Sequence, residues 1–266
     1  MSLLATIFLS VGSPAIIEPC PLLPGVEVLA EQPQIQWIIV GEQHGTVETP
    51  VIFGDLVCNL ALSRKIVVGL EMPASMQVEI DNFTNSDGGE KARAEFLQLP
   101  FWHTRMKDGR SSKAMFALLD RLRQMRRVGV IHGVVAFAPA GWPGTATRYE
   151  ELMAENVRGA VRSGQTFIAL VGSIHALRTH WQTNGTPYMP MAGLLPGGQS
   201  ATFKVVADGG SNWACTAPEK CGPQPVGNTR PVGERKLVFG RAPDLAYSGI
   251  IAIGGPVSAS PPQVQE

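Results

Sequence analysis

The chain has 266 residues, a length that suits one large α/β domain and would also allow two small domains. Hydrophobic residues make up 44% of it and charged residues 17%, which indicates a globular protein with a substantial core and few surface charges. The 22 Lys and Arg residues are matched by 22 Asp and Glu residues, so the formal net charge is +0. A protein that binds nucleic acid usually carries a basic excess or a basic stripe, so we expect no nucleic-acid partner.

The amino terminus has features of an export signal. Residues 1–15 form a short apolar run that ends in Ser13-Pro14-Ala15, a small-x-small pattern typical of a cleavage point. We therefore expect a signal peptide at 1–15 and a periplasmic or secreted mature protein, although no Lys or Arg precedes the run. A buried N-terminal strand is the alternative interpretation. The run is too short to cross a bilayer, so we expect no membrane span.

The four cysteines favour disulfide bonds, because an even number in an exported chain usually pairs. Cys215 and Cys221 bracket a short loop and are the pair we expect first. Cys20 then pairs with Cys58 by elimination, or Cys58 is a free buried thiol on a helix. The sequence has no Cys-x-x-Cys pair, so a structural zinc site of the ribbon type is not indicated.

Up to about residue 177, the chain alternates between strand-like and helix-like segments. Apolar, β-branched runs predict buried strands at 36–40, 66–70, 128–138 and 166–171. Capping signals and apolar spacing predict helices at 49–63, 75–83, 90–97, 111–126 and 149–162. Buried strands that alternate with helices predict an α/β fold, with a mostly parallel sheet flanked by helices on both faces.

The pattern is weaker in the last third of the chain. We predict strands at 201–207 and 247–253, and between them a loop rich in Gly, Pro and Cys at 209–233. Residues 258–266 are expected to be a disordered tail. No linker divides the chain, so we expect a single α/β domain at 16–257.

Ionisable residues follow each of the four predicted strands. Glu42 and His44 come after the first strand, Glu71 ends the second, Arg148 lies past the third, and His175 follows the fourth. Ligands of open α/β sheets bind outside the carboxyl ends of the strands. We therefore predict an active site at that edge, formed by these five residues.

Other polar residues are weaker candidates. Asp108 and Arg110 could lie at the rim of the site or contact substrate. His132 falls inside an apolar strand, and we expect it to be a buried core histidine. His103 is expected to be a packed loop histidine, and His180 a surface or rim residue.

Four segments resemble one protein superfamily. Gly41–Glu48 is similar to the Gly-Glu-x-His signature of the erythromycin esterases, ChaN-like haem-binding proteins and TIKI-type proteases. Val68–Met72 resembles the strand of that superfamily that ends in Glu, Arg148–Val157 its Arg-x-x-x-Met-Ala helix, and Val171–Ala176 its Gly-Asn-x-His-Ala strand exit. A lone Gly-Glu-x-His would be a weak signal, but four segments in the expected order are fairly specific.

The resemblance departs from the superfamily in two respects. Ser173 stands where its members often have Asn, and the chain beyond about Leu194 carries no match. The resemblance implies the fold and the site more strongly than a substrate, because members differ in activity. An erythromycin esterase would activate water without a metal, and a TIKI-type protease would use one.

The residues themselves suggest a hydrolase that acts on an ester or amide bond of a small-molecule or peptide substrate. His44 or His175 could deprotonate a water molecule, because imidazole titrates near neutral pH. Glu42 or Glu71 would orient that imidazole, and Arg148 would bind a carboxylate or stabilise an oxyanion. No Gly-x-Ser-x-Gly elbow is present, so a serine nucleophile is not indicated.

Two alternatives for this site remain open at the level of sequence. A metal-dependent enzyme would use Glu42, His44, Glu71 and His175 as ligands of a divalent ion. A ChaN-like protein without hydrolytic activity would bind haem, with a histidine or Tyr149 as the axial ligand. The sequence does not determine the oligomeric state.

Overall fold

A computed structural model of the protein describes residues 20–183, 185–217, 220–227, 233–240 and 246–265. The signal peptide expected at 1–15 lies outside these residues. In the described part of the chain, no helix has both the length and the apolar character needed to cross a membrane.

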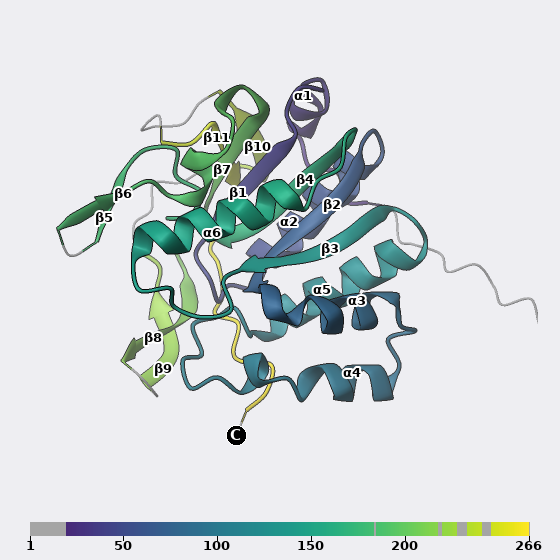
Figure 1. The fold of residues 1–266 in the computed structure, drawn as a ribbon, viewed down its shortest axis with the longest axis vertical. Helices are drawn as coiled ribbons and strands as arrows, with labels where there is room; N and C mark the ends of the chain where they lie inside the picture. The colour runs from purple at the N-terminus through teal and green to yellow at the C-terminus, as the bar shows by residue number, and fades with distance from the viewer. Residues whose placement is uncertain (1–19, 184, 218–219, 228–232, 241–245, 266) are drawn as a thin grey trace, which may run out of the picture.

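A seven-stranded sheet forms the centre of the molecule (Figure 1). Its strands are β1 (Trp37–Glu42), β2 (Lys65–Pro73), β3 (Ile131–Ala138), β4 (Gln165–Gly172), β7 (Ser200–Val206), β10 (Lys236–Phe239) and β11 (Gly249–Ala252). Their order across the sheet is β10-β11-β7-β1-β4-β2-β3. All neighbouring pairs are parallel except β10 and β11.

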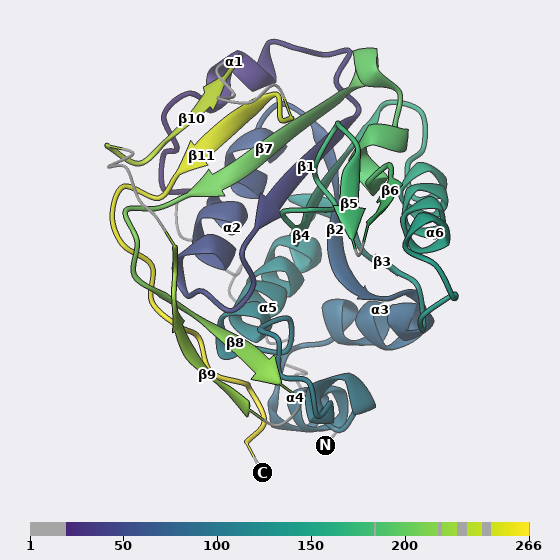
Figure 2. The same ribbon diagram turned by 90° about the vertical axis from the view of Figure 1, so that its left-hand side faces the viewer.

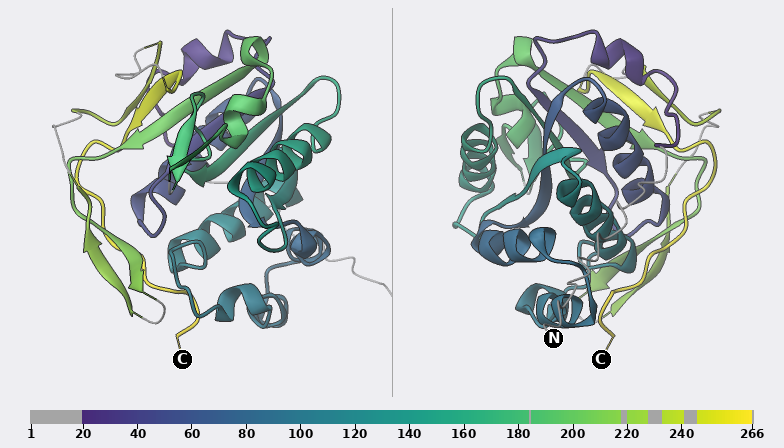
Figure 3. Two further views of the ribbon diagram at one scale, coloured as in Figure 1. Left: turned by 60° about the vertical axis from the view of Figure 1, so that its left-hand side comes forward. Right: turned by 90° about the vertical axis from the view of Figure 1, so that its right-hand side faces the viewer.

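Helices cover both faces of this sheet (Figures 1 and 3). The α-helices are α1 (Val26–Ala30), α2 (Glu48–Ala61), α3 (Gln77–Asn85), α4 (Glu90–Leu97), α5 (Lys113–Arg127) and α6 (Ala146–Gly159). Short 3-10 helices lie at η1 (Ala74–Met76), η2 (Pro100–His103), η3 (Met191–Leu194) and η4 (Gly197–Gln199). Two hairpins lie outside the seven-stranded sheet, β5 (Trp181–Thr183) with β6 (Thr186–Tyr188) and β8 (Ser211–Ala217) with β9 (Lys220–Pro225) (Figures 1 and 2).

The sheet separates two hydrophobic cores. Ile38 and Val40 of β1 pack with the apolar residues of α1, α2, α3 and α5 on one face. Trp37 and Ile39 alternate with them and pack on the other face, where α6 contributes Met153, Ala154 and Val157. Since side chains of a strand alternate between faces, a continuous apolar run is what a strand buried on both faces requires. The predicted fold class is therefore confirmed.

The four predicted strands of the first two thirds are neighbours in this sheet. The spatial order β1-β4-β2-β3 places β4 in the middle, with its partners parallel to it on both sides. The third strand starts later than predicted, at Ile131, and the prediction of a buried His132 is wrong. β3 is an edge strand, and its side chains alternate: Ile131 is buried against one face, whereas the imidazole of His132 is exposed on the other.

The last third of the chain is more ordered than the sequence suggested. The segment 209–233, predicted as a loop, contains the β8–β9 hairpin. Residues 258–265, predicted as a disordered tail, are hydrogen-bonded to the body of the protein. The amides of Lys113 and Val47 donate to the carbonyls of Pro261 and Ser258, and Ser260 is 1% exposed. The segment is held in place by backbone hydrogen bonds to distant parts of the chain, and a Pro- and Ser-rich sequence does not reveal such bonds.

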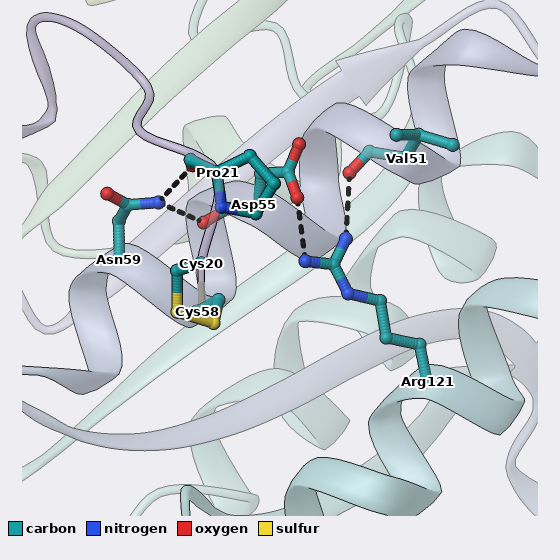
Figure 4. The surroundings of a disulfide bond; sticks show 7 residues. All are labelled: Cys20, Pro21, Val51, Asp55, Cys58, Asn59 and Arg121. Atoms are coloured by element: carbon teal, nitrogen blue, oxygen red, sulfur yellow. Dashed lines mark hydrogen bonds and ion pairs between the residues drawn. A yellow bond between two sulfur atoms is a disulfide. The ribbon is translucent and has the colours of Figure 1, made fainter. Parts of the chain in front are cut away.

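Both expected disulfides are present, and the alternative of a free thiol at Cys58 is excluded. Cys20 is bonded to Cys58 of α2, and Cys215 to Cys221 across the β8–β9 hairpin. Figure 4 shows the first bond, beside which the Asn59 amide donates to the carbonyls of Pro21 and Asp55. The bond and these contacts fix the start of the described chain to α2. Two disulfides are compatible with an extracellular or periplasmic protein.

Candidate active site

The carboxyl ends of three neighbouring strands form the floor of the candidate site. Glu42, at the end of β1, is in register with Gly172 at the end of β4. On the other side of β4, Leu70 of β2 pairs with Leu170, and Glu71 follows it. Because parallel strands end at the same edge, the two carboxylates and the segment after β4 meet there.

His44 lies between two carboxylates. Its Nδ1 is 2.9 Å from Oε1 of Glu42, and its Nε2 is 3.3 Å from Oε2 of Glu71. Glu42 and Glu71 are 3% and 5% exposed, so both depend on protein groups for compensation of their charge. The imidazole of His44 is thus held at both nitrogens.

His175 has a separate carboxylate partner. Its Nδ1 is 2.7 Å from Oε1 of Glu150, a residue of α6 that is 2% exposed. The amide of Met191 donates to the other oxygen of Glu150 at 2.8 Å, which fixes the carboxylate. The Nε2 of His175 lies 3.9 Å from Oε1 of Glu71, beyond hydrogen-bonding distance. This Nε2 atom has no hydrogen-bond partner among these carboxylates and is available to a ligand in the site.

Arg110 supplies the guanidinium of the cluster. Its Nη1 donates to Oε1 of Glu71 at 3.2 Å, and its Nη2 donates to Oδ2 of Asp108 at 2.7 Å. The sequence suggested Asp108 and Arg110 as residues of the rim or as contacts of the substrate. The structure places Arg110 against Glu71, and Asp108 against Arg110, in the loop that precedes α5.

Arg148 is not part of this cluster. It lies in the first turn of α6, where its amide donates to the hydroxyl of the N-cap residue Thr145. Its guanidinium points to solvent and pairs with Glu151 at 3.1 Å and Glu155 at 3.0 Å. The five predicted residues thus divide into four that meet and one that does not.

Two glycines allow the close packing of the strand exits. The Gly172 amide donates to Oε2 of Glu71 at 2.7 Å, and a Cβ at Gly172 would lie only 3.0 Å from Nε2 of His44. Gly45 has φ of 80°, and a Cβ there would meet the backbone of Trp213. Each glycine keeps the backbone close to a partner that a larger residue would displace.

The charges of the cluster shift the pKa values of its members. Burial disfavours the imidazolium of His44, but Glu71 and Glu42 outweigh burial and raise the pKa of His44 to about 10. Burial also opposes ionisation of Glu71, yet His44, His175 and Arg110 hold its pKa far below the usual range. Near neutral pH, His44 is therefore a cation between two carboxylates.

His175 is shifted in the same direction. Burial lowers its pKa, but the hydrogen bond to Glu150 and the charge of Glu71 raise it above its ordinary value. Burial and the charge of Glu71 likewise raise the pKa of Tyr149, whose ring centroid is 5.8 Å from that of His175. Tyr149 thus remains a neutral phenol near neutral pH.

A cleft opens above these residues. One part of it, with a volume of about 530 Å³, is lined by His44, Glu71, Arg110, Tyr149, Glu150 and His175, among others. An adjoining hollow of about 320 Å³ is lined by Glu42, His44, Asp108 and Asn212. His44 and His175 line both parts, so a small molecule bound in the cleft would contact both histidines.

The cluster as arranged does not fit a metal ion. Among the described residues, no group of three or more His, Cys, Asp or Glu side chains has a geometry that would hold one. Both ring nitrogens of His44 face carboxylates, so this imidazole binds its neighbours instead of an ion.

The remaining histidines lie outside the cleft. His103 is exposed, and its Nε2 is 2.9 Å from the carbonyl oxygen of Leu97. His180 is exposed as expected for a surface residue. Neither lines the two parts of the cleft described above.

Glu150 is the residue that sequence reasoning missed. It lies two positions after Arg148, in the segment that carries the superfamily resemblance. A signal was available in the sequence. The i, i+3, i+4, i+7 spacing of a buried helix face is present at Glu150, Met153, Ala154 and Val157. A carboxylate in phase with an apolar face needs a buried partner, and here that partner is His175.

Comparisons with known proteins find similarity at the level of structure. No family model and no curated protein matches the sequence. The structure is similar to that of a mutant of the erythromycin esterase EreC in its open conformation, with a TM-score of 0.62 and 10% identity over 90% of this chain and 94% of that one.

Two further solved structures are similar over nearly the whole chain. A protein from Bacillus cereus has a TM-score of 0.60 and 13% identity, covering 91% of this chain and 93% of its own. A succinoglycan biosynthesis protein has a TM-score of 0.56 and 10% identity, covering 92% and 94%. At these identities the likeness concerns the fold, and it confirms the resemblance at that level: the chain has the fold of the erythromycin esterases.

Proposed function

We propose that the protein is a hydrolase that cleaves an ester or amide bond by activating water with His175. The observation that carries the proposal is the Glu150–His175 pair. A buried carboxylate 2.7 Å from Nδ1 leaves the other nitrogen, Nε2, to accept a proton on the side of the cleft. A carboxylate that orients an imidazole in this way fixes its tautomer and stabilises the imidazolium that forms.

The cations beside Glu71 have a complementary role. Arg110 would donate to the carbonyl oxygen as negative charge develops on it when water attacks, and the charge of His44, whose two ring nitrogens already face carboxylates, would act on it without a direct hydrogen bond. Glu42 and Glu71 hold the imidazolium of His44, and Asp108 with Glu71 holds the guanidinium of Arg110. Charged donors fixed in advance need little reorganisation during the reaction, which is why such an arrangement favours catalysis.

This proposal gives different roles to His44 and His175, which the sequence suggested as alternative bases. A general base must be able to lose its proton near the working pH. His44, with a pKa of about 10, is a poor base and a good cation, whereas His175 has one carboxylate partner at hydrogen-bonding distance. The fold is similar to that of an erythromycin esterase, so hydrolysis is one activity that this fold carries, but the fold alone does not identify the activity.

A location outside the cytoplasm belongs to the same proposal. The two disulfides support export, because such bonds persist in oxidising compartments. We propose a periplasmic or secreted single-domain hydrolase, released from its signal peptide within the first residues of the chain. Mass spectrometry of the protein from its native compartment would detect an intact Met1 if export by cleavage did not occur.

The proposal is tested with a panel of carboxylic esters and amides. The parent protein should release acid from at least one of them, and His175→Ala should reduce the rate by about two to four orders of magnitude, as loss of a general base does. His103→Ala is the matched control, because His103 is exposed and lies outside the cleft. Equal rates for the parent and His175→Ala would contradict the proposal. A parent that hydrolyses nothing but takes up stoichiometric haem, seen as an absorbance band, would favour the binding alternative.

A further inference from the structure

A row of aromatic rings leads from the mouth of the cleft to His175. The ring centroids of Trp142 and Tyr149 are 5.9 Å apart, with an interplanar angle of 29°. The ring of Tyr149 lies in turn 5.8 Å from that of His175, tilted by 35°. Trp142 comes from the loop between β3 and α6, and Tyr149 from the first turns of α6.

The outer ring of this row is open to solvent. Trp142 is 67% exposed, although tryptophan is usually largely buried. It lines the cleft together with Ala146 and Tyr188. We call the aromatic side chains that line the cleft, Trp142, Tyr149 and Tyr188, the aromatic wall.

The same cleft is also lined by the charged residues His44, Glu71 and Arg110, beside which the reacting carbonyl is proposed to lie. A ligand that contacts both kinds of side chain would combine a polar group with a flat apolar one. The cleft volume of about 530 Å³ is within the range of sites for small molecules.

We infer that Trp142 determines specificity, and that the substrate carries an aromatic ring next to the bond that is cleaved. This inference rests on the proposed hydrolase function. The ring stacks on the indole of Trp142, which places the scissile carbonyl between His175 and the cations His44 and Arg110. Aromatic pairs of this kind add attraction beyond the burial of apolar area, since their electrostatic quadrupoles favour offset stacking.

The first experiment compares 1-naphthyl acetate with cyclohexyl acetate, two esters of the same acid that differ in the aromatic character of the alcohol. Trp142→Ala should raise KM for the naphthyl ester roughly fivefold and leave KM for the cyclohexyl ester unchanged. Trp142→Phe should restore most of the loss, because it keeps a ring. Trp181→Ala is the matched control: Trp181 is 42% exposed on the β5–β6 hairpin and does not line the cleft. Equal effects of Trp142→Ala on both esters would overturn the inference.

The second experiment does not require turnover. Dissociation constants are measured for 1-acetonaphthone and for acetylcyclohexane, two methyl ketones that have no ester or amide bond to hydrolyse and that carry an aromatic and a saturated ring. The naphthyl ketone should bind roughly fivefold more weakly to Trp142→Ala than to the parent and to Trp181→Ala, while acetylcyclohexane binds all three alike. If the parent hydrolyses no ester but shows this pattern, the role of Trp142 in binding aromatic ligands is supported and the hydrolase proposal is contradicted. If the naphthyl ketone does not bind the parent, or binds Trp142→Ala equally well, the inference is overturned.

Discussion

Glu71 joins the charged residues of the site. Its two oxygens contact His44, Arg110 and the amide of Gly172, and it lies where β2 shifts register against β3, between Leu70 and Pro73. Irregularities of this kind turn a side chain away from its regular direction. Because this carboxylate is nearly buried, its negative charge must be compensated by the cations near it.

Removing His44 should therefore affect stability as well as rate. In the structure, His44→Ala leaves Glu42 and Glu71 without their shared cation, and breaking a buried pair typically costs about 3–5 kcal/mol. We expect a loss of that order in urea unfolding at pH 6. His132→Ala, which removes an exposed imidazole, is the control and should have little effect.

The pH dependence of this loss has a definite sign. The pKa of His44 is raised from 6.5 to about 10 on folding, so its contribution is fully present below pH 6.5 and is lost as the pH rises through about 10. The difference in unfolding free energy between the parent and His44→Ala should therefore shrink between pH 6.5 and 10. A difference that grows with pH in this range would show that His44 is not the cation of the cluster.

At the scale of elements, the β8–β9 hairpin supports the strand exit that carries His44. The side-chain amide of Asn212 donates to the carbonyl of His44 at 3.0 Å, and the amide of Trp213 donates to the carbonyl of Gly45 at 2.8 Å. The Cys215–Cys221 bond links the two strands of the hairpin just beyond these contacts. The hairpin therefore holds the backbone of the site from a part of the chain that shows no resemblance to the superfamily.

Replacing both cysteines of the hairpin by alanine tests this support. Opening a loop of this size should lower the free energy of unfolding by about 2 kcal/mol in the chain-entropy model. Because Asn212 and Trp213 lie within three residues of Cys215, the rate of ester hydrolysis should fall as well, while the Cys20–Cys58 bond is retained. Chemical unfolding and turnover are measured on the same preparation. Unchanged values of both would mean that the disulfide contributes nothing to the hairpin or to the site.

At the scale of the whole molecule, the central strands of the sheet and four residues of the site could be predicted from the sequence. The strands β1, β2 and β4 were predictable because they are buried on both faces and read as continuous apolar runs. Glu42, His44, Glu71 and His175 were predictable as neighbours because strands of one sheet end at one edge. These inferences need only local patterns and one rule of topology.

What the sequence did not predict depends on the phase of a helix and on long-range contacts. Arg148 and Glu150 are two residues apart, and only the direction of α6 decides that the carboxylate faces His175 while the guanidinium faces solvent. Residues 258–265 pair with loops near residues 47 and 111, more than 140 positions away along the chain. No local signal marks such pairing.

The most direct test of the account is the pH dependence of kcat/KM for the parent and for Glu150→Gln, on an ester that the parent hydrolyses. The parent should show a bell: the rate rises as His175 loses its proton, with an apparent pKa above 6.5, and falls as His44 loses its own near pH 10. Glu150→Gln removes the carboxylate that raises the pKa of His175, so the acid limb should move to lower pH and the maximal rate should fall on the order of 10²-fold. An acid limb that stays in place in Glu150→Gln would contradict the assignment of His175 as the base oriented by Glu150.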